Sequence, residues 1–118
     1  MAYAAGEMLK GKICMKLLTF TVPCYNSQDY MCRCVDSLLV GGEDVEIIIV
    51  DDGSVDDTGK IADEYARKYP SIVRVIHQEN GGHGAGLNAG LNHATGLYFK
   101  VVDSDDWVDE ESYHQILD

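Results

Sequence analysis

The sequence predicts an α/β fold in three layers, α/β/α, built around a mainly parallel, twisted sheet. Two observations support this prediction. Apolar runs typical of strands alternate with amphipathic segments typical of helices, and the connections between them are short. A polar cluster also follows directly behind each of the four apolar runs. Such alternation is typical of a parallel sheet whose right-handed crossover helices cover both faces.

The first half of the chain supplies two predicted strands with a helix between them. Residues 16–22 are rich in β-branched and large apolar side chains, and this strand is expected to end at Pro23. Ser27 is a suitable N-cap for a helix whose apolar residues recur at helical spacing, and the Gly-Gly pair at 41–42 ends it. Residues 45–50 are almost entirely apolar, as expected for a strand buried on both faces of a parallel sheet.

The second half continues the same alternation. An amphipathic helix is expected to end before Pro70, and residues 72–77 form a third strand. A glycine-rich loop opens the next helix, Gly96 closes it, and residues 97–102 form a fourth strand. A last helix is expected to begin near Asp109. Residues 16–118 therefore form one domain, and residues 1–15 are an N-terminal extension that does not fit the alternation.

Composition limits the classes of function. The 118 residues are 46% hydrophobic, enough for one globular domain with a core. With 20 acidic against 9 basic residues the net charge is −11, so nucleic acid is excluded as the main partner. No apolar run approaches the ~18 residues of a membrane span. The N-terminal segment lacks the apolar region of a signal peptide, and the four cysteines lack zinc spacing, so reduced thiols and a cytoplasmic location are expected.

The polar clusters should meet at one edge of the sheet. "PCYN", "DDGS", "QENGGHG" and "DSDD" follow the four strands in turn, and open α/β sheets bind ligands at the carboxyl ends of their strands. Asp103, Asp105 and Asp106 would repel one another unless a cation lay among them, and Mg²⁺ or Mn²⁺ suits carboxylates beside phosphate oxygens. The glycine loop, with His83 in it, suits phosphate, and Tyr25 could stack on a base ring. The sequence thus predicts a nucleoside diphosphate that carries a transferable group.

Each cluster also has a purely structural explanation. "DDGS" could be only a turn that caps a helix, and the glycines could be only a flexible loop. "DSDD" could be a solvated cap for the last helix. Cys24, next to the predicted site, is expected to pack inward as a small hydrophobe and is otherwise a target for alkylation.

Four segments, "TVPCYN", "IIIVDDGSVDDT", "ENGGHGAGLNAGLNHATG" and "KVVDSDDW", occur in this order and at these spacings. Together they resemble the Rossmann-like, nucleotide-sugar-binding half of glycosyltransferase family 2, which has the GT-A fold. The resemblance covers residues 16–118. It implies an inverting glycosyltransferase with a donor that is UDP-linked, and an acceptor hydroxyl on a glycan or a lipid-linked molecule.

The resemblance also implies roles for individual residues. Pro23 and Tyr25 would line the base pocket, Asp52 would contact the base, and Asp103 would reach the ribose. The metal would be held by Asp105, with Asp106 beside it. The full set of residues assigned to the nucleotide is Pro23, Tyr25, Asn26, Asp51, Asp52, Gly53, Asn80, Gly82, Asn88, Gly90, Asp103 and Ser104.

Two departures from the family pattern qualify these roles. Leu87 stands where the family often has arginine, which leaves the donor's identity open. The sequence ends at Asp118, before the half that supplies the acceptor surface and the catalytic base, so no catalytic residue is assigned. The chain is therefore expected to be a donor-binding half that is inactive alone and associates with itself. The longer protein is expected in the cytoplasm or at the membrane periphery.

Three other functions compete with this interpretation. A receiver-type phospho-acceptor domain also has an acidic metal pocket, but it needs a lone aspartate after the third strand, where this sequence has "VIHQEN". A metal-dependent nucleotidyltransferase would need a basic, glycine-rich loop after the first strand, where "PCYNSQDY" has no basic residue. A non-catalytic nucleotide-binding module on the same fold remains open, and only a transfer assay separates it from an enzyme.

Overall fold

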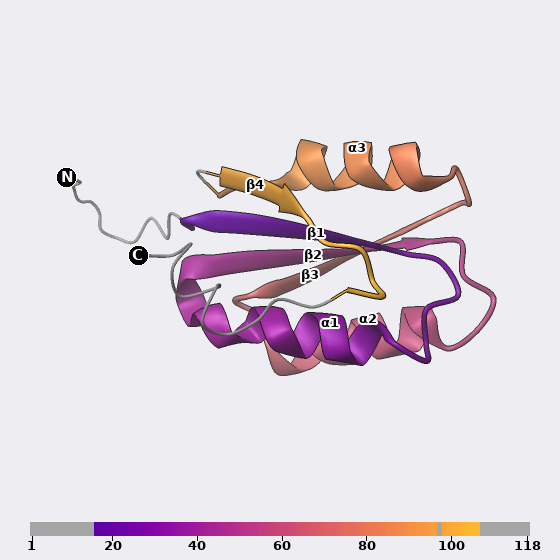
Figure 1. The fold of residues 1–118 in the computed structure, drawn as a ribbon, viewed down its shortest axis with the longest axis horizontal. Coiled ribbons are helices and arrows are strands. Elements are labelled where there is room, and N and C mark those ends of the chain that lie inside the picture. The colour runs from indigo at the N-terminus through magenta and orange to yellow at the C-terminus, as the bar shows by residue number, and fades with distance from the viewer. Residues whose placement is uncertain (1–15, 97, 107–118) are drawn as a thin grey trace.

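The computed structural model describes residues 16–96 and 98–106. Within them it contains a four-stranded sheet in the order β3-β2-β1-β4, and every neighbouring pair is parallel (Figure 1). The strands are β1 (Leu18–Cys24), β2 (Val45–Asp52), β3 (Val73–Gln78) and β4 (Tyr98–Val101). The predicted extension 1–15 and the helix expected near Asp109 lie outside the described residues.

Helices cover both faces of this sheet. They are α1 (Met31–Leu38), the short 3-10 helix η1 (Leu39–Asp44), α2 (Thr58–Lys68) and α3 (His83–His93). Figure 1 shows α1 and α2 on one face and α3 on the other. The predicted three-layer α/β/α architecture is confirmed. No helix among the described residues combines the length and apolarity needed to cross a bilayer.

The centre of the sheet is buried. All eight residues of β2 are buried, and α1 contributes four buried side chains from one stripe. On the face covered by α1, the core is built from β-branched and large apolar residues of β1 and β2 together with Met31, Val35 and Leu38 of α1. This burial explains why the segment 45–50 is apolar on both of its faces.

Two boundaries differ from the sequence prediction. The first strand runs through Pro23 to Cys24, because β4 pairs with β1 only as far as Thr21 and needs no N–H group from the proline. The N-cap prediction for Ser27 is wrong: α1 begins at Met31 after Tyr30, with no side-chain cap. The Ser27 hydroxyl contacts Ser104 instead.

A buried carboxylate joins α3 to the amino end of the sheet. Glu46 of β2 accepts hydrogen bonds from Thr19 Oγ1 (3.0 Å), the Thr95 N–H (2.9 Å) and the Arg74 guanidinium (3.1 Å). Burial alone would raise the pKa of Glu46, but these hydrogen bonds outweigh it and the pKa is lowered. Arg74 also donates to the His93 carbonyl at the end of α3 (2.9 Å), so one ion pair holds three elements together.

Helix α3 approaches β1 closely at a glycine. A Cβ added at Gly90 would clash with the Oγ1 and Cγ2 atoms of Thr21 and would lie 2.8 Å from Thr21 Cβ. Only a residue without a side chain leaves this spacing between helix and sheet.

Candidate functional site

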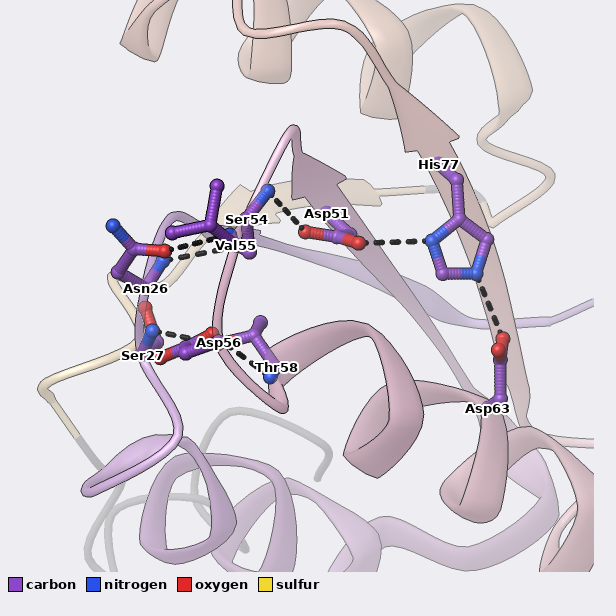
Figure 2. Close-up of polar contacts among 9 residues, drawn as sticks. All are labelled: Asn26, Ser27, Asp51, Ser54, Val55, Asp56, Thr58, Asp63 and His77. Atoms are coloured by element: carbon purple, nitrogen blue, oxygen red, sulfur yellow. Dashed lines mark hydrogen bonds and ion pairs between the residues drawn. The ribbon is translucent and has the colours of Figure 1, made fainter.

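The loops that follow β1 and β2 are tied together at the carboxyl edge of the sheet. The Asn26 N–H donates to Ser54 Oγ (3.0 Å), and Asn26 Oδ1 accepts from the Val55 N–H (3.0 Å), as Figure 2 shows. Asn26 has a φ of 49°, the left-handed region that asparagine adopts more readily than most residues. Two of the predicted polar clusters therefore form one surface.

A second tie runs through the start of α2. The Ser27 N–H donates to Thr58 Oγ1 (2.7 Å), and the Thr58 N–H donates to Asp56 Oδ1 (2.9 Å). Thr58 is fully buried at the first position of α2. The "DDGSVDDT" segment thus connects the loop after β1 to the helix that follows β2.

The loop after β4 joins this surface through two buried serines. The hydroxyl oxygens of Ser27 and Ser104 lie 2.9 Å apart although 77 residues separate them in the sequence. Cys24 lies beneath them, and its burial raises the pKa of its thiol to about 12. The predicted inward packing of Cys24 is confirmed, and a thiol this hard to ionise is a poor nucleophile.

Asp52 organises the loop after β3. Its carboxylate accepts hydrogen bonds from Gln78 Nε2, the Gly81 N–H and the Gly82 N–H, each at 2.9 Å. Burial would raise the pKa of Asp52, but these three donors outweigh it and lower the pKa, so the carboxylate stays ionised. A carboxylate has about four acceptor positions, which leaves roughly one of them for a ligand N–H.

Gly53 and Asn80 bring that loop against the end of β2. Gly53 has a φ of 74°, and a Cβ there would lie 2.6 Å from the Asn80 backbone nitrogen. Asn80 Nδ2 donates to the Asp52 carbonyl at 3.1 Å. Both predicted site residues therefore shape the backbone, and Gly53 is required for the close approach.

Asp51 faces away from Asp52, toward α2. Its Oδ1 accepts from the Ser54 N–H (3.1 Å), and its Oδ2 lies 2.9 Å from Nδ1 of His77 (Figure 2). His77 is the cross-strand neighbour of Asp51 in the β2–β3 register and also contacts Asp63 of α2. Sequence reasoning missed His77, the last residue of the third predicted strand, because its contact with Asp51 depends on the register of β2 and β3.

Three aspartates behind β4 form the predicted acidic cluster. Asp103, Asp105 and Asp106 are exposed, and each offers a carboxylate oxygen within 4.8 Å of the others. The Asp106 N–H donates to the Asp103 carbonyl (2.9 Å), which folds the segment into a turn. An exposed set of oxygen donors fits Mg²⁺ or Mn²⁺, which keep positions for water and phosphate oxygens.

The remaining predicted residues are spread more widely. Tyr25 is half exposed at 50%, with ring surface available to a ligand, and Pro23 is partly buried inside β1. Asn88 is exposed on α3. Gly90 is buried over Thr21, in the middle of β1, so helix packing accounts for it. The side chain of His83 lies outside the described part of the chain.

Comparison with known proteins identifies the same architecture. The Glycosyl transferase family 2 model matches residues 19–118. The chain is 40% identical over 103 residues to the uncharacterized glycosyltransferase EpsJ of Bacillus subtilis, covering 86% of this chain and 30% of EpsJ. It is 39% identical over 99 residues to the poly(ribitol-phosphate) beta-glucosyltransferase of Bacillus spizizenii, covering 80% of this chain and 16% of that enzyme.

A solved structure agrees with this result. The crystal structure of S. aureus TarS 1-349 in complex with UDP superposes with a TM-score of 0.75 at 30% identity, covering 86% of this chain and 31% of that one. The chain therefore spans about a third or less of the relatives that it matches. A family model that matches nearly the whole chain, on a GT-A fold, shows that this protein belongs to glycosyltransferase family 2.

Proposed function

We propose that this chain is the donor-binding part of an inverting glycosyltransferase whose donor is a UDP-linked sugar. The observation that carries the proposal is the convergence of four polar loops, with the acidic cluster among them, on the carboxyl edge of one sheet. The UDP complex of TarS, at 30% identity, supports the choice of uridine. The proposal extends to a longer protein, because this chain covers only 30% of EpsJ and 16% of the poly(ribitol-phosphate) beta-glucosyltransferase.

Individual side chains would then have distinct tasks. The exposed ring of Tyr25 would lie against the base, and the remaining acceptor position of Asp52 would take a base N–H. Asp103 would reach the ribose hydroxyls. Asn26 and Ser104 would hold the surrounding loops in place through their contacts with Ser54 and Ser27.

The acidic cluster would hold a divalent cation. Asp105 and Asp106 would be its ligands, and the bound ion would offset the negative charge of the leaving diphosphate. Without a cation, a diphosphate beside three exposed carboxylates in a chain of net charge −11 is electrostatically unfavourable. Nucleotide binding should therefore depend on metal.

The acceptor and the catalytic base would come from the rest of the longer protein. We propose that a hydroxyl of a glycan or a lipid-linked acceptor attacks the anomeric carbon after a carboxylate removes its proton. The poly(ribitol-phosphate) beta-glucosyltransferase among the relatives supports a polymeric acceptor. We expect the transfer to take place in the cytoplasm or at the membrane periphery. This chain alone should transfer no sugar, and a transfer assay on the longer protein separates an enzyme from a non-catalytic binding module.

Titration calorimetry with UDP tests the binding step. We expect weak binding in Mn²⁺ and about tenfold weaker binding in EDTA, the scale of one lost charge interaction. Asp105→Asn should remove the metal effect. Asp44→Asn, which makes the same charge change at an exposed position at the end of η1, should leave it unchanged.

The alternative outcomes are equally specific. UDP binding of equal strength in EDTA and Mn²⁺, or a metal effect that survives Asp105→Asn, would show that the acidic cluster only caps a helix. If Asp105→Asn and Asp44→Asn reduced the metal dependence of UDP binding equally, the dependence would come from net charge instead.

A further inference from the structure

We infer that His77 is a positioning residue of the nucleotide site, a protonated clamp between Asp51 and Asp63 that fixes the loop carrying Asn26 and Ser54. The inference rests on the proposed function, because it concerns how the same site is held ready for a nucleotide. It adds a residue that lies outside the four sequence motifs and that is not itself expected to contact the nucleotide or the metal.

The contacts of the imidazole ring require a charged histidine. Nδ1 lies 2.9 Å from Asp51 Oδ2, and Nε2 lies 2.8 Å from Asp63 Oδ1 (Figure 2). A neutral imidazole has one N–H, so one ring nitrogen would then turn a lone pair toward a carboxylate. Only the imidazolium satisfies both contacts. The hydrogen bonds that His77 donates to Asp63 and to Asp51 accordingly raise its pKa.

The clamp continues into the loops of the site. Asp51 uses its second oxygen, Oδ1, to accept the Ser54 N–H at 3.1 Å. Ser54 Oγ accepts the Asn26 N–H at 3.0 Å, and Asn26 Oδ1 accepts the Val55 N–H at 3.0 Å. Each link fixes the donor or acceptor of the next, so the position of the Asp51 carboxylate determines how the loops after β1 and β2 meet.

The space around Asp51 is closed on the side of α2. A Cβ added at Gly59 would lie 2.8 Å from Asp51 Oδ2 and 3.4 Å from His77 Cε1. The Asp51 side chain is only 10% exposed, whereas that of His77 is 48% exposed. The carboxylate is therefore held by its surroundings, and the ring that neutralises it remains open to exchange protons with water.

The charged groups that face His77 come from two elements. Asp51 belongs to β2 and Asp63 to α2. Arg74, the nearest cation on β3, lies three residues away and so on the opposite face of that strand, where it contacts Glu46. When His77 loses its proton, two carboxylates remain with no cation between them, and the clamp should open.

The direction of the pH effect follows from the raised pKa. A histidine whose folded pKa lies above its unfolded value of about 6.5 stabilises the folded arrangement fully at a pH below the unfolded value. This stabilisation is lost as the pH rises through the folded pKa. UDP affinity should therefore fall with rising pH over that window. The phosphate of UDP titrates nearby, so the informative quantity is the difference between wild type and variant at each pH.

Calorimetry with UDP and Mg²⁺ from about pH 6 to about pH 8.5 tests the clamp. His77→Ala should bind about tenfold more weakly than wild type at low pH and show no difference at high pH, as for a lost charge-assisted hydrogen bond. His77→Asn, which keeps a neutral donor toward Asp51, should recover part of the affinity without its own pH step. Asp63→Asn should move the midpoint to lower pH, and His93→Asn, at another exposed histidine, should change nothing.

NMR of the same proteins separates the outcomes. The His77 ring should titrate at the midpoint seen by calorimetry, and the Ser54 and Asn26 amide signals should move with it. The clamp is refuted if UDP binds but wild type and His77→Ala share one pH profile, or if those amide signals ignore the His77 titration. Absence of UDP binding by wild type at every pH would instead refute the proposed function, and with it any role of the clamp in binding.

Discussion

At the scale of single residues, two threonines of β1 make opposite use of their hydroxyls. Thr19 Oγ1 donates to Glu46 and accepts the Gly96 N–H at 2.8 Å. Thr21 Oγ1 is also buried, but it has no hydrogen-bond partner among the described residues. A buried hydroxyl without a partner costs free energy, whereas a bonded one holds its neighbours in place.

We therefore predict that Thr21→Val stabilises the chain by about 1 kcal/mol, because it replaces an unpaired hydroxyl with a methyl group of similar size. The matched variant Thr19→Val should destabilise it by about 1–3 kcal/mol, because it leaves Glu46 and Gly96 without a partner. Urea denaturation measures both. If Thr21→Val lowered the midpoint as Thr19→Val does, the Thr21 hydroxyl must have a partner in solution.

The site was predictable where residue type alone determines chemistry. Carboxylates packed as in "DSDD" suggested the acidic cluster before any geometry was known, and the structure places those oxygens together. The contacts of Asp51 with His77 and of Ser27 with Ser104 were not predictable. They depend on strand register and on the packing of distant loops, which no local pattern encodes.

At the scale of secondary structure, the packing of α3 on β1 depends on one glycine. Helix propensity alone favours alanine over glycine by about 1 kcal/mol. At Gly90 this preference is overridden, because an added Cβ would clash with Thr21. At Gly84, near the start of the same helix, nothing lies within 4 Å of the added atom.

Gly90→Ala should therefore destabilise the chain by about 1–3 kcal/mol through overpacking, while Gly84→Ala should stabilise it by up to about 1 kcal/mol. Thermal and urea unfolding of the two variants beside wild type give the comparison. A gain in stability from both substitutions would mean that α3 lies farther from the sheet than the structure places it.

Element type was predictable from hydrophobic period, and the order of strands and helices agrees throughout the described residues. The boundaries of the strands and helices were harder to predict from the sequence. Pro23 was expected to end its strand, since proline lacks an N–H, but whether an N–H is needed depends on how far the neighbouring strand extends. The role of Ser27 was missed for a similar reason, because its better partner, Ser104, comes 77 residues later.

At the scale of the whole molecule, β4 forms one end of the described sheet. Its four residues pair with β1 alone among those residues, and Tyr98 is 66% exposed. A strand with one unpaired edge offers N–H and C=O groups to another chain. We therefore predict that this chain forms dimers or larger species.

Light scattering at about 50 µM, a concentration suited to weak association, measures the mass directly. Tyr98→Lys should shift the distribution toward monomer, since a charge on an edge strand opposes pairing. A monodisperse wild-type monomer would exclude this edge as a contact, and association unchanged by Tyr98→Lys would place the contact on another surface.

The strand order has a consequence for how the protein is made. β1 is an interior strand, but Leu18 pairs with Tyr98, and Tyr98 leaves the ribosome long after β2 and β3 have been synthesised. The nascent chain can therefore join β1, β2 and β3 and close the clamp at His77 while one side of β1 is still open. Strand β4 then pairs with the open side of β1 and brings the acidic cluster with it, so the half of the site expected to bind the base is built before the half expected to bind the metal. Until then the open side of β1 is a template for wrong pairing, and we expect chaperone dependence to be greatest in that interval of synthesis.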